Sequence, residues 1–167
     1  MIGPDSEAEK MAGSSPEQQL AGFIARFTPQ VAGIAKSARA KVRKLLPRAF
    51  ELVYDNYNAL ALAFGPTERA SEVILSIALY PRWVSLFFAR GARLPDPDGV
   101  LRGTGKQIRH VVLERIEVLN SAPVRRLMKD AVATHPVPFG TGRGRTIIKS
   151  VSAKQRPRRP PKGDAPR

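Results

Sequence analysis

The sequence predicts an α+β domain, and three observations support this prediction. Two segments in which apolar residues recur with helical spacing come first. Several short alternating apolar runs follow, and one more segment with helical spacing comes after them. Helices and strands segregated into blocks in this way are typical of α+β domains. The apolar runs are also closely spaced, which implies antiparallel hairpins because a parallel crossover needs about a dozen residues or more. We therefore expect an antiparallel sheet of four or five strands, with N-terminal helices and a C-terminal helix packed on one face.

The first helix is expected to begin at Ser15, which precedes a Pro-Glu-Gln sequence. Ser15 is the predicted N-cap, and Gln18 is placed to close a capping box. Thr28-Pro29 repeats the start signal, and an apolar helical period continues from there to Pro47. We interpret the basic residues of this second helix as a solvated face rather than a binding surface; they are Lys36, Arg39, Lys41, Arg43 and Lys44.

Short apolar runs follow Pro47. Residues 50–55 are compatible with a strand or with a last helical turn, and a second run at 60–64 ends at Gly65-Pro66. Residues 73–80 and 83–88 alternate as two strands joined by a turn.

The turn between these two strands, Pro81-Arg82, also argues against a membrane span. The apolar stretch around it is short for a span, and a charge at its middle would cost at least ~2.5 kcal/mol in a bilayer. We therefore expect no membrane partner.

The rest of the predicted domain consists of a loop, a strand and a helix. Residues 93–105 are rich in glycine, proline and aspartate, as loops are, and 107–113 is predicted to be a strand. Asn120 or Ser121 caps the last helix, which two prolines end. Its expected buried face consists of Val124, Leu127, Met128 and Ala131.

The charge of the chain is concentrated near its C-terminus. The 167 residues include 28 Lys and Arg against 14 Asp and Glu, a net charge of +14. Residues 141–167 contain nine basic residues and one acid, which is +8 of that total. We divide the chain into a disordered N-terminus at 1–14, an α+β domain at 15–139, and a basic Pro/Arg-rich tail at 140–167.

The tail is the first candidate for a partner contact. A basic, proline-rich segment binds phosphate backbones without sequence preference, so the tail could contact nucleic acid or another polyanion. The alternative is a solubilising extension, although Thr146–Val151 is apolar enough to dock as an edge strand. The candidate nucleic-acid contacts are Arg143, Arg145, Lys149, Lys154, Arg156, Arg158, Arg159 and Lys162.

The loop before the predicted strand 107–113 is a second candidate. Its Gly-Thr-Gly-Lys sequence could form a small anion nest from free backbone N–H groups beside a cation. The alternative, which we favour, is a hairpin with a solvated rim. The candidate anion-binding residues are Arg90, Arg93, Arg102, Gly103, Gly105, Lys106 and Arg109.

The sequence contains no recognisable catalytic or metal-binding constellation. Without cysteine it has no disulfide, thiolate ligand or cysteine nucleophile, which suits a reducing cytoplasm. It has no nucleophile elbow, and neither His110 nor His135 has a placed serine and acid partner. Asp96 and Asp98 are interpreted as turn residues rather than calcium ligands. We expect a cytoplasmic protein that is not an enzyme and has no metal site and no cofactor.

An ordered series of segments resembles a known family. The segments are Lys44-Leu45-Leu46-Pro47, the strand 83–88 running into Ala89-Arg90-Gly91-Ala92-Arg93-Leu94, the loop Pro95-Asp96-Pro97-Asp98-Gly99, and Gly103-Thr104-Gly105-Lys106 leading into Ile108-Arg109-His110. Together they are similar to the DUF1801 domain, also called YdhG-like, over about residues 20–133. The resemblance implies a compact bacterial α+β domain, in a family whose members mostly lack an assigned activity.

One branch of that family is described as frataxin-like iron chaperones for Fe–S or haem assembly. Such carriers use exposed carboxylates, which suit hard cations, whereas the carboxylates of this chain are scattered and outnumbered by basic residues. The expected function is therefore a binding or adaptor module whose basic tail contacts a polyanion. An iron-binding chaperone is the alternative.

Overall fold

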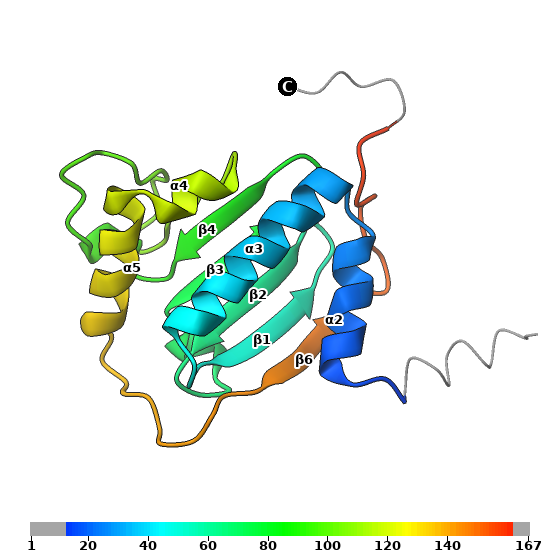
Figure 1. Ribbon diagram of the computed structural model, residues 1–167, viewed down its shortest axis with the longest axis horizontal. Helices are drawn as coiled ribbons and strands as arrows, with labels where there is room; N and C mark the ends of the chain where they lie inside the picture. The colour runs from blue at the N-terminus through cyan, green and yellow to red at the C-terminus, as the bar shows by residue number, and fades with distance from the viewer. Residues whose placement is uncertain (1–12, 162–167) are drawn as a thin grey trace, which may run out of the picture.

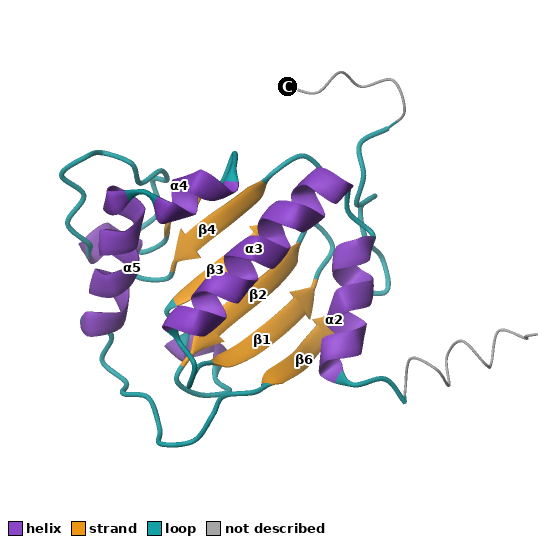
Figure 2. Cartoon of the chain, viewed as in Figure 1, coloured by secondary structure: helices purple, strands orange, loops and turns teal. Residues whose placement is uncertain are grey.

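A six-stranded sheet organises the described part of the chain, residues 13–161 of the computed structural model (Figures 1 and 2). The strand order is β5-β4-β3-β2-β1-β6, in which β1 pairs with β6 in parallel and all other neighbours are antiparallel. The strands are β1 (Phe50–Asp55), β2 (Leu60–Gly65), β3 (Leu75–Leu79), β4 (Val84–Phe88), β5 (Arg109–Val112) and β6 (Thr146–Val151). The α+β class is thus confirmed, but the sheet is mixed and larger than the four or five antiparallel strands predicted.

The helices begin and end close to the predicted positions. Figure 1 shows α2 and α3 lying across the front of the sheet, with α4 and α5 near the β4 end. Ser15 and Gln18 form the predicted capping box, and Thr28 caps the second helix. The helices are α2 (Pro16–Ala25), α3 (Pro29–Leu45), α4 (Ile116–Asn120) and α5 (Ala122–Ala133), with short 3-10 turns η1 (Ala70–Glu72) and η2 (Gly91–Arg93). The buried residues of α5 are the four predicted, whereas α4 was not foreseen.

The parallel pair arises because β6 reaches the sheet only after a long connection. Between β1 and β6 the chain forms four strands and two helices, and a long crossover of this kind is what a parallel pair requires. Val53 lies opposite Ile148, and the register shifts immediately after this pair. Residues 146–151, which the sequence places in the tail, are therefore an edge strand of the sheet, as the alternative interpretation of this apolar segment allowed.

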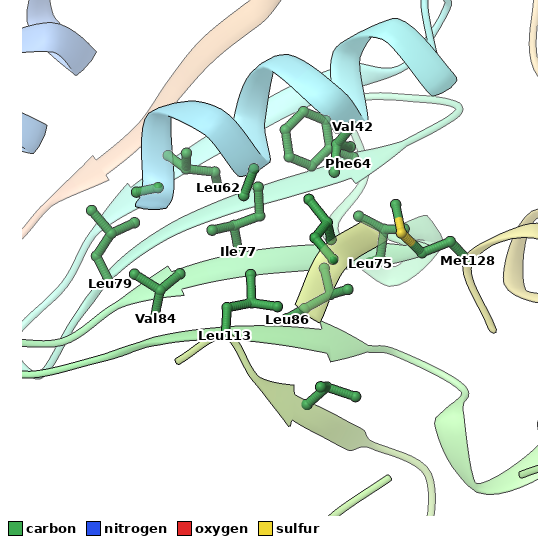
Figure 3. Close-up of a cluster of buried hydrophobic side chains, with 14 of the residues drawn as sticks. Val42, Leu62, Phe64, Leu75, Ile77, Leu79, Val84, Leu86, Leu113 and Met128 are labelled. Atoms are coloured by element: carbon green, nitrogen blue, oxygen red, sulfur yellow. The ribbon is translucent and has the colours of Figure 1, made fainter. Parts of the chain in front are cut away.

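The core lies between the sheet and the helices in front of it (Figure 3). Leu62, Ile77 and Leu86 are paired in register across β2, β3 and β4, and each is 0% exposed. Val42 from α3 and Met128 from α5 belong to the same buried cluster. This apolar layer is continuous from the first long helix to the last one.

Strand β1 resolves the ambiguity of residues 50–55 and brings charge into this layer. Val53 pairs with Leu62 and is fully buried, so residues two positions away on β1 point to the same face. Those residues are Glu51 and Asp55, which are only 2% and 1% exposed. Buried carboxylates need partners, and both partners lie outside the strand.

Candidate anion-binding site at the start of β6

The chain enters β6 pressed against the turn that joins α3 to β1. A Cβ atom built on Gly144 would lie 1.7 Å from the carbonyl oxygen of Ala49, so only glycine allows this approach. The amide of Glu51 donates a hydrogen bond to the carbonyl of Arg145 (3.0 Å). These contacts hold Arg143 and Arg145, on either side of the glycine, beside the end of α3.

Three arginines line a surface hollow of about 230 Å³ at this point. Arg43 comes from α3, and Arg143 and Arg145 come from the lead-in to β6. The hydroxyl-bearing Thr146 and the carboxylate of Glu51 also line the hollow. Guanidinium groups present several N–H donors in a planar fork that matches phosphate or carboxylate oxygens.

The three guanidinium groups remain accessible to a ligand. Arg43 and Arg145 each contact one carboxylate, with side chains that are 51% and 70% exposed. Arg143 is exposed and has no ion-pair partner within residues 13–161. Exposed ion pairs contribute little free energy, so a phosphate group can replace either carboxylate.

An ion-pair network next to the hollow supports it. Arg39 donates Nε to Oε2 of Glu51 (2.8 Å) and Nη2 to Oε1 of Glu51 (2.7 Å) and to Oε1 of Glu17 (2.7 Å). The hydroxyl of Thr146 donates to Glu51 as well (2.8 Å). Both oxygens of Glu51 therefore accept hydrogen bonds within the protein, and this carboxylate has a structural role.

The same network shifts two pKa values. The hydrogen bond from Arg39 holds the pKa of Glu17 below its usual 4.5, although partial burial acts in the opposite direction. Burial would lower the pKa of Arg39, but its hydrogen bonds to Glu51 and Glu17 outweigh this and raise the pKa above its ordinary range. The hydrogen bonds from Arg39 to the two carboxylates thus favour its charged form.

The depressed pKa of Glu17 predicts a small loss of stability in acid. A carboxylate whose pKa is lower in the folded chain stabilises it above the unfolded pKa of 4.5, and this contribution disappears as pH falls through the folded value. Because the Glu17 side chain is 50% exposed, we expect at most ~1 kcal/mol. Urea midpoints measured from about pH 5 to about pH 3 should fall less steeply for Glu17→Gln than for the wild type. The matched change Glu114→Gln, at an exposed glutamate without an ion pair in the described part of the chain, should leave the slope unchanged.

Arg39 also shows what the sequence interpretation missed. It was assigned to a solvated helix face, yet its side chain is only 16% exposed. Arg39 follows Ala35 by four residues and precedes Val42 by three, and both of these are 0% exposed. This spacing places Arg39 along the buried side of the helix and is the signal that could have revealed it.

Arg158 is not available to a polyanion, which corrects the predicted set of tail contacts. Its side chain is 2% exposed, and Nη2 donates to Oδ1 of Asp55 (2.9 Å). Its neighbour Arg159 donates Nε to the carbonyl of Arg26 at the end of α2 (3.1 Å). A guanidinium buried in an ion pair cannot reach external phosphates. Lys162 lies outside the described residues.

Three further tail cations are exposed, and two of them make contacts within the protein. Lys149 donates to the carbonyl of Glu68 (3.2 Å), and the guanidinium of Arg156 lies 5.5 Å from the ring centre of Tyr57. Lys154 is exposed and has no ion-pair partner in the described part of the chain. Lys149 lies within β6, and Lys154 and Arg156 follow this strand in the chain.

In the second predicted anion site, a basic side chain is hydrogen-bonded to the backbone of its own loop. Arg109 donates Nη1 to the carbonyl oxygens of Gly105 and Ile108. Gly103, with a φ of 120°, adopts a conformation that favours glycine, and Arg102 forms an isolated bridge with His110. The Arg109 guanidinium therefore stabilises the loop by hydrogen bonds to two of its carbonyl groups.

The other cations of this loop differ from Arg109 in their surroundings. Arg90 lines a small hollow with His135 on the side of α5. Arg93 and Lys106 are exposed and have no ion-pair partner among the residues that the structure describes. The backbone of the loop is compact, as Gly91 lies against the β5 residue Arg109. The other four basic residues of this candidate site do not line the hollow beside Arg90.

Potential metal ligands are likewise dispersed. Within residues 13–161, no group of three or more His, Asp or Glu side chains could hold a metal ion. The His110 ring lies 5.1 Å from that of Phe87, and Nδ1 of His135 contacts the backbone of Val137. The carboxylate of Asp96 accepts hydrogen bonds from two loop amides (2.9 Å each), which is turn chemistry.

No protein-family model, curated protein or solved structure matches this chain. Among the described helices, none combines the length and apolar character needed to cross a membrane. The arrangement of the arginines therefore carries the functional argument.

Proposed function

We propose that this protein is a non-enzymatic binding module that contacts nucleic acid, as a polyanion, through the hollow lined by Arg43, Arg143 and Arg145. The observation that carries the proposal is that Arg43 on α3 and the pair Arg143 and Arg145, about a hundred residues later in the sequence, line one hollow. A cytoplasmic location and membership of the DUF1801 family are parts of the same proposal, supported by the absence of cysteine and by the ordered segments described above.

The physical basis of the proposal is electrostatic. Each phosphate neutralised by an arginine releases condensed counterions, so such binding weakens as salt concentration rises. The excess of 28 basic over 14 acidic residues favours long-range attraction of any polyanion, and the hollow localises the contact. Contacts of this kind go to the phosphate backbone and carry no base specificity.

The test removes two arginines of the hollow and compares the effect with that of removing two basic residues elsewhere. Fluorescence anisotropy with a labelled DNA duplex and a single-stranded RNA should show that Arg143→Ala/Arg145→Ala raises Kd at least about tenfold. The slope of log Kd against log salt should fall by about one for each lost phosphate contact. The equally charged pair Arg102→Ala/Lys106→Ala, in the loop before β5, should change neither quantity.

Two results would contradict the proposal: no salt-dependent binding by the wild type, or equal losses for both pairs, which would indicate diffuse attraction. Deleting residues 141–167 is not a clean test because it also removes β6 and Arg158 from the fold. Calorimetry with Fe(II) addresses the alternative, an iron-binding chaperone, for which the described residues supply no ligand cluster. Saturable Fe(II) binding together with unchanged nucleic-acid affinity in the Arg143/Arg145 variant would favour that alternative.

A further inference from the structure

Besides the arginine hollow, a groove of about 390 Å³ lies between the C-terminal part of α3 and the helices α4 and α5. It has an apolar floor and a basic rim. Its lining residues are Lys41, Lys44, Leu45, Leu119, Arg125, Met128 and Lys129. No residue of the arginine hollow belongs to it, so it presents a separate surface.

The floor is part of the core except at one end. Leu119 and Met128 are 0% and 3% exposed and anchor the groove to the folded body. Leu45, the last residue of α3, is 44% exposed. A large apolar side chain at the surface, continuous with buried ones, is a typical feature of a contact site for an apolar group.

The rim carries four cations in two rows. Lys41 and Lys44 are three residues apart on α3, and Arg125 and Lys129 are four apart on α5, so each pair lies on one side of its helix. None of the four has an ion-pair partner within residues 13–161, and no acidic residue lines the groove. Their methylene stems extend the apolar walls while their charged ends face solvent.

From this arrangement we propose that the groove binds an amphipathic acidic helix of a partner protein. Such a helix places an apolar stripe on the floor and acidic side chains along both edges, where the two rows of cations lie. The proposal follows from charge complementarity as well as shape. A nucleic acid would pair with the cations but leave Leu45 exposed.

A small amphipathic anion fits the same groove less well. One head group satisfies one or two cations, whereas the rim offers four on opposite sides. Small-molecule sites also commonly bury about 70–90% of their ligand, which a groove with an exposed leucine at its floor does not provide. A helix covers the full length of both rows.

The test uses the full-length protein and a synthetic helical peptide with a leucine stripe flanked by glutamates. Fluorescence anisotropy should show saturable binding, and a peptide of equal charge with serine in place of each leucine should bind at least about tenfold more weakly. Leu45→Glu and Lys129→Glu should each raise Kd for the leucine peptide by about tenfold or more. The matched charge reversal Lys36→Glu, at an exposed position of α3 outside the groove, should leave Kd within about twofold after correction for net charge.

Four peptide results would overturn the inference: no saturable binding, equal affinity for the two peptides, no effect of Leu45→Glu, or no effect of Lys129→Glu. A fifth would come from a small amphiphile. Dodecanoate serves as the small amphiphile. If it shifts the NMR methyl signals of Leu45 and Met128 at lower concentration than the peptide does, the occupant is a small anion and the proposal fails. Thermal melting of each variant confirms that the fold is retained, which is expected because Leu45, Lys129 and Lys36 are exposed.

Discussion

Replacing Asp55 with alanine is expected to lower the free energy of unfolding by about 3–5 kcal/mol. Asp55 and Arg158 form an ion pair in which both side chains are 2% exposed, so the substitution leaves a buried guanidinium without its counterion. Arg158 keeps only its hydrogen bond to the carbonyl of Asn56 and its position over the Phe27 ring. Urea unfolding followed by circular dichroism measures the loss.

The double substitution Asp55→Ala/Arg158→Met distinguishes this cause from a general packing defect. Methionine fills the space over Phe27 without a charge, so the double variant should be more stable than Asp55→Ala alone. Arg158→Met by itself should be milder than Asp55→Ala, because Asp55 retains Arg26 at 3.7 Å. If the two single losses simply add in the double variant, the buried charge is not the cause.

The substitution Arg39→Ala is expected to have an effect of similar size, about 3–5 kcal/mol. It removes three of the hydrogen bonds in the network and leaves the carboxylate of Glu51, which is 3% exposed, with only the hydroxyl of Thr146. An unpaired carboxylate at this depth in β1 opposes the packing of α3 on the sheet. Differences in the urea midpoint at neutral pH measure the effect.

Neutralising the partner should recover much of this loss. In Arg39→Ala/Glu51→Gln the buried charge is gone, so we expect the double variant to be more stable than Arg39→Ala alone. The exposed cation Lys36 on the same helix supplies the control, since Lys36→Ala should change stability by no more than about 0.5 kcal/mol. Comparable losses at Lys36 and Arg39 would show that the network contributes nothing specific.

The sequence placed residues 140–167 in a tail and offered docking of Thr146–Val151 as an edge strand only as an alternative, which the structure confirms. These two networks explain why the sequence could not name the partners of this segment. Arg158 and Thr146 belong to a segment that is basic and rich in proline, which by composition resembles a disordered extension. Their partners, Asp55 and Glu51, are about a hundred residues away in the chain. No local pattern reveals such a pairing, because it depends on β6 lying beside β1.

The sequence predicted only part of the arginine hollow. Arg143 and Arg145 were identified from their charge, but Arg43 was assigned to a solvated helix face. Gly144 packs against Ala49 and brings the two tail arginines to the same hollow as Arg43. Composition identifies cations without showing which of them converge. Arg158 shows the opposite error. Its place in the basic tail predicted a contact with nucleic acid, but the fold buries its side chain.

The sequence by itself determined the α+β class, the capped starts of α2 and α3, and the buried face of α5. These features follow from capping chemistry and hydrophobic periodicity, which act over a few residues. Only the tertiary structure decided the parallel pairing of β6, the burial of Arg39 and Arg158, and the separation of the basic surface into an arginine hollow and a cation-rimmed groove. Charge and burial at these positions are set by neighbours distant in the chain, because a buried ion is stable only where the fold brings its counterion.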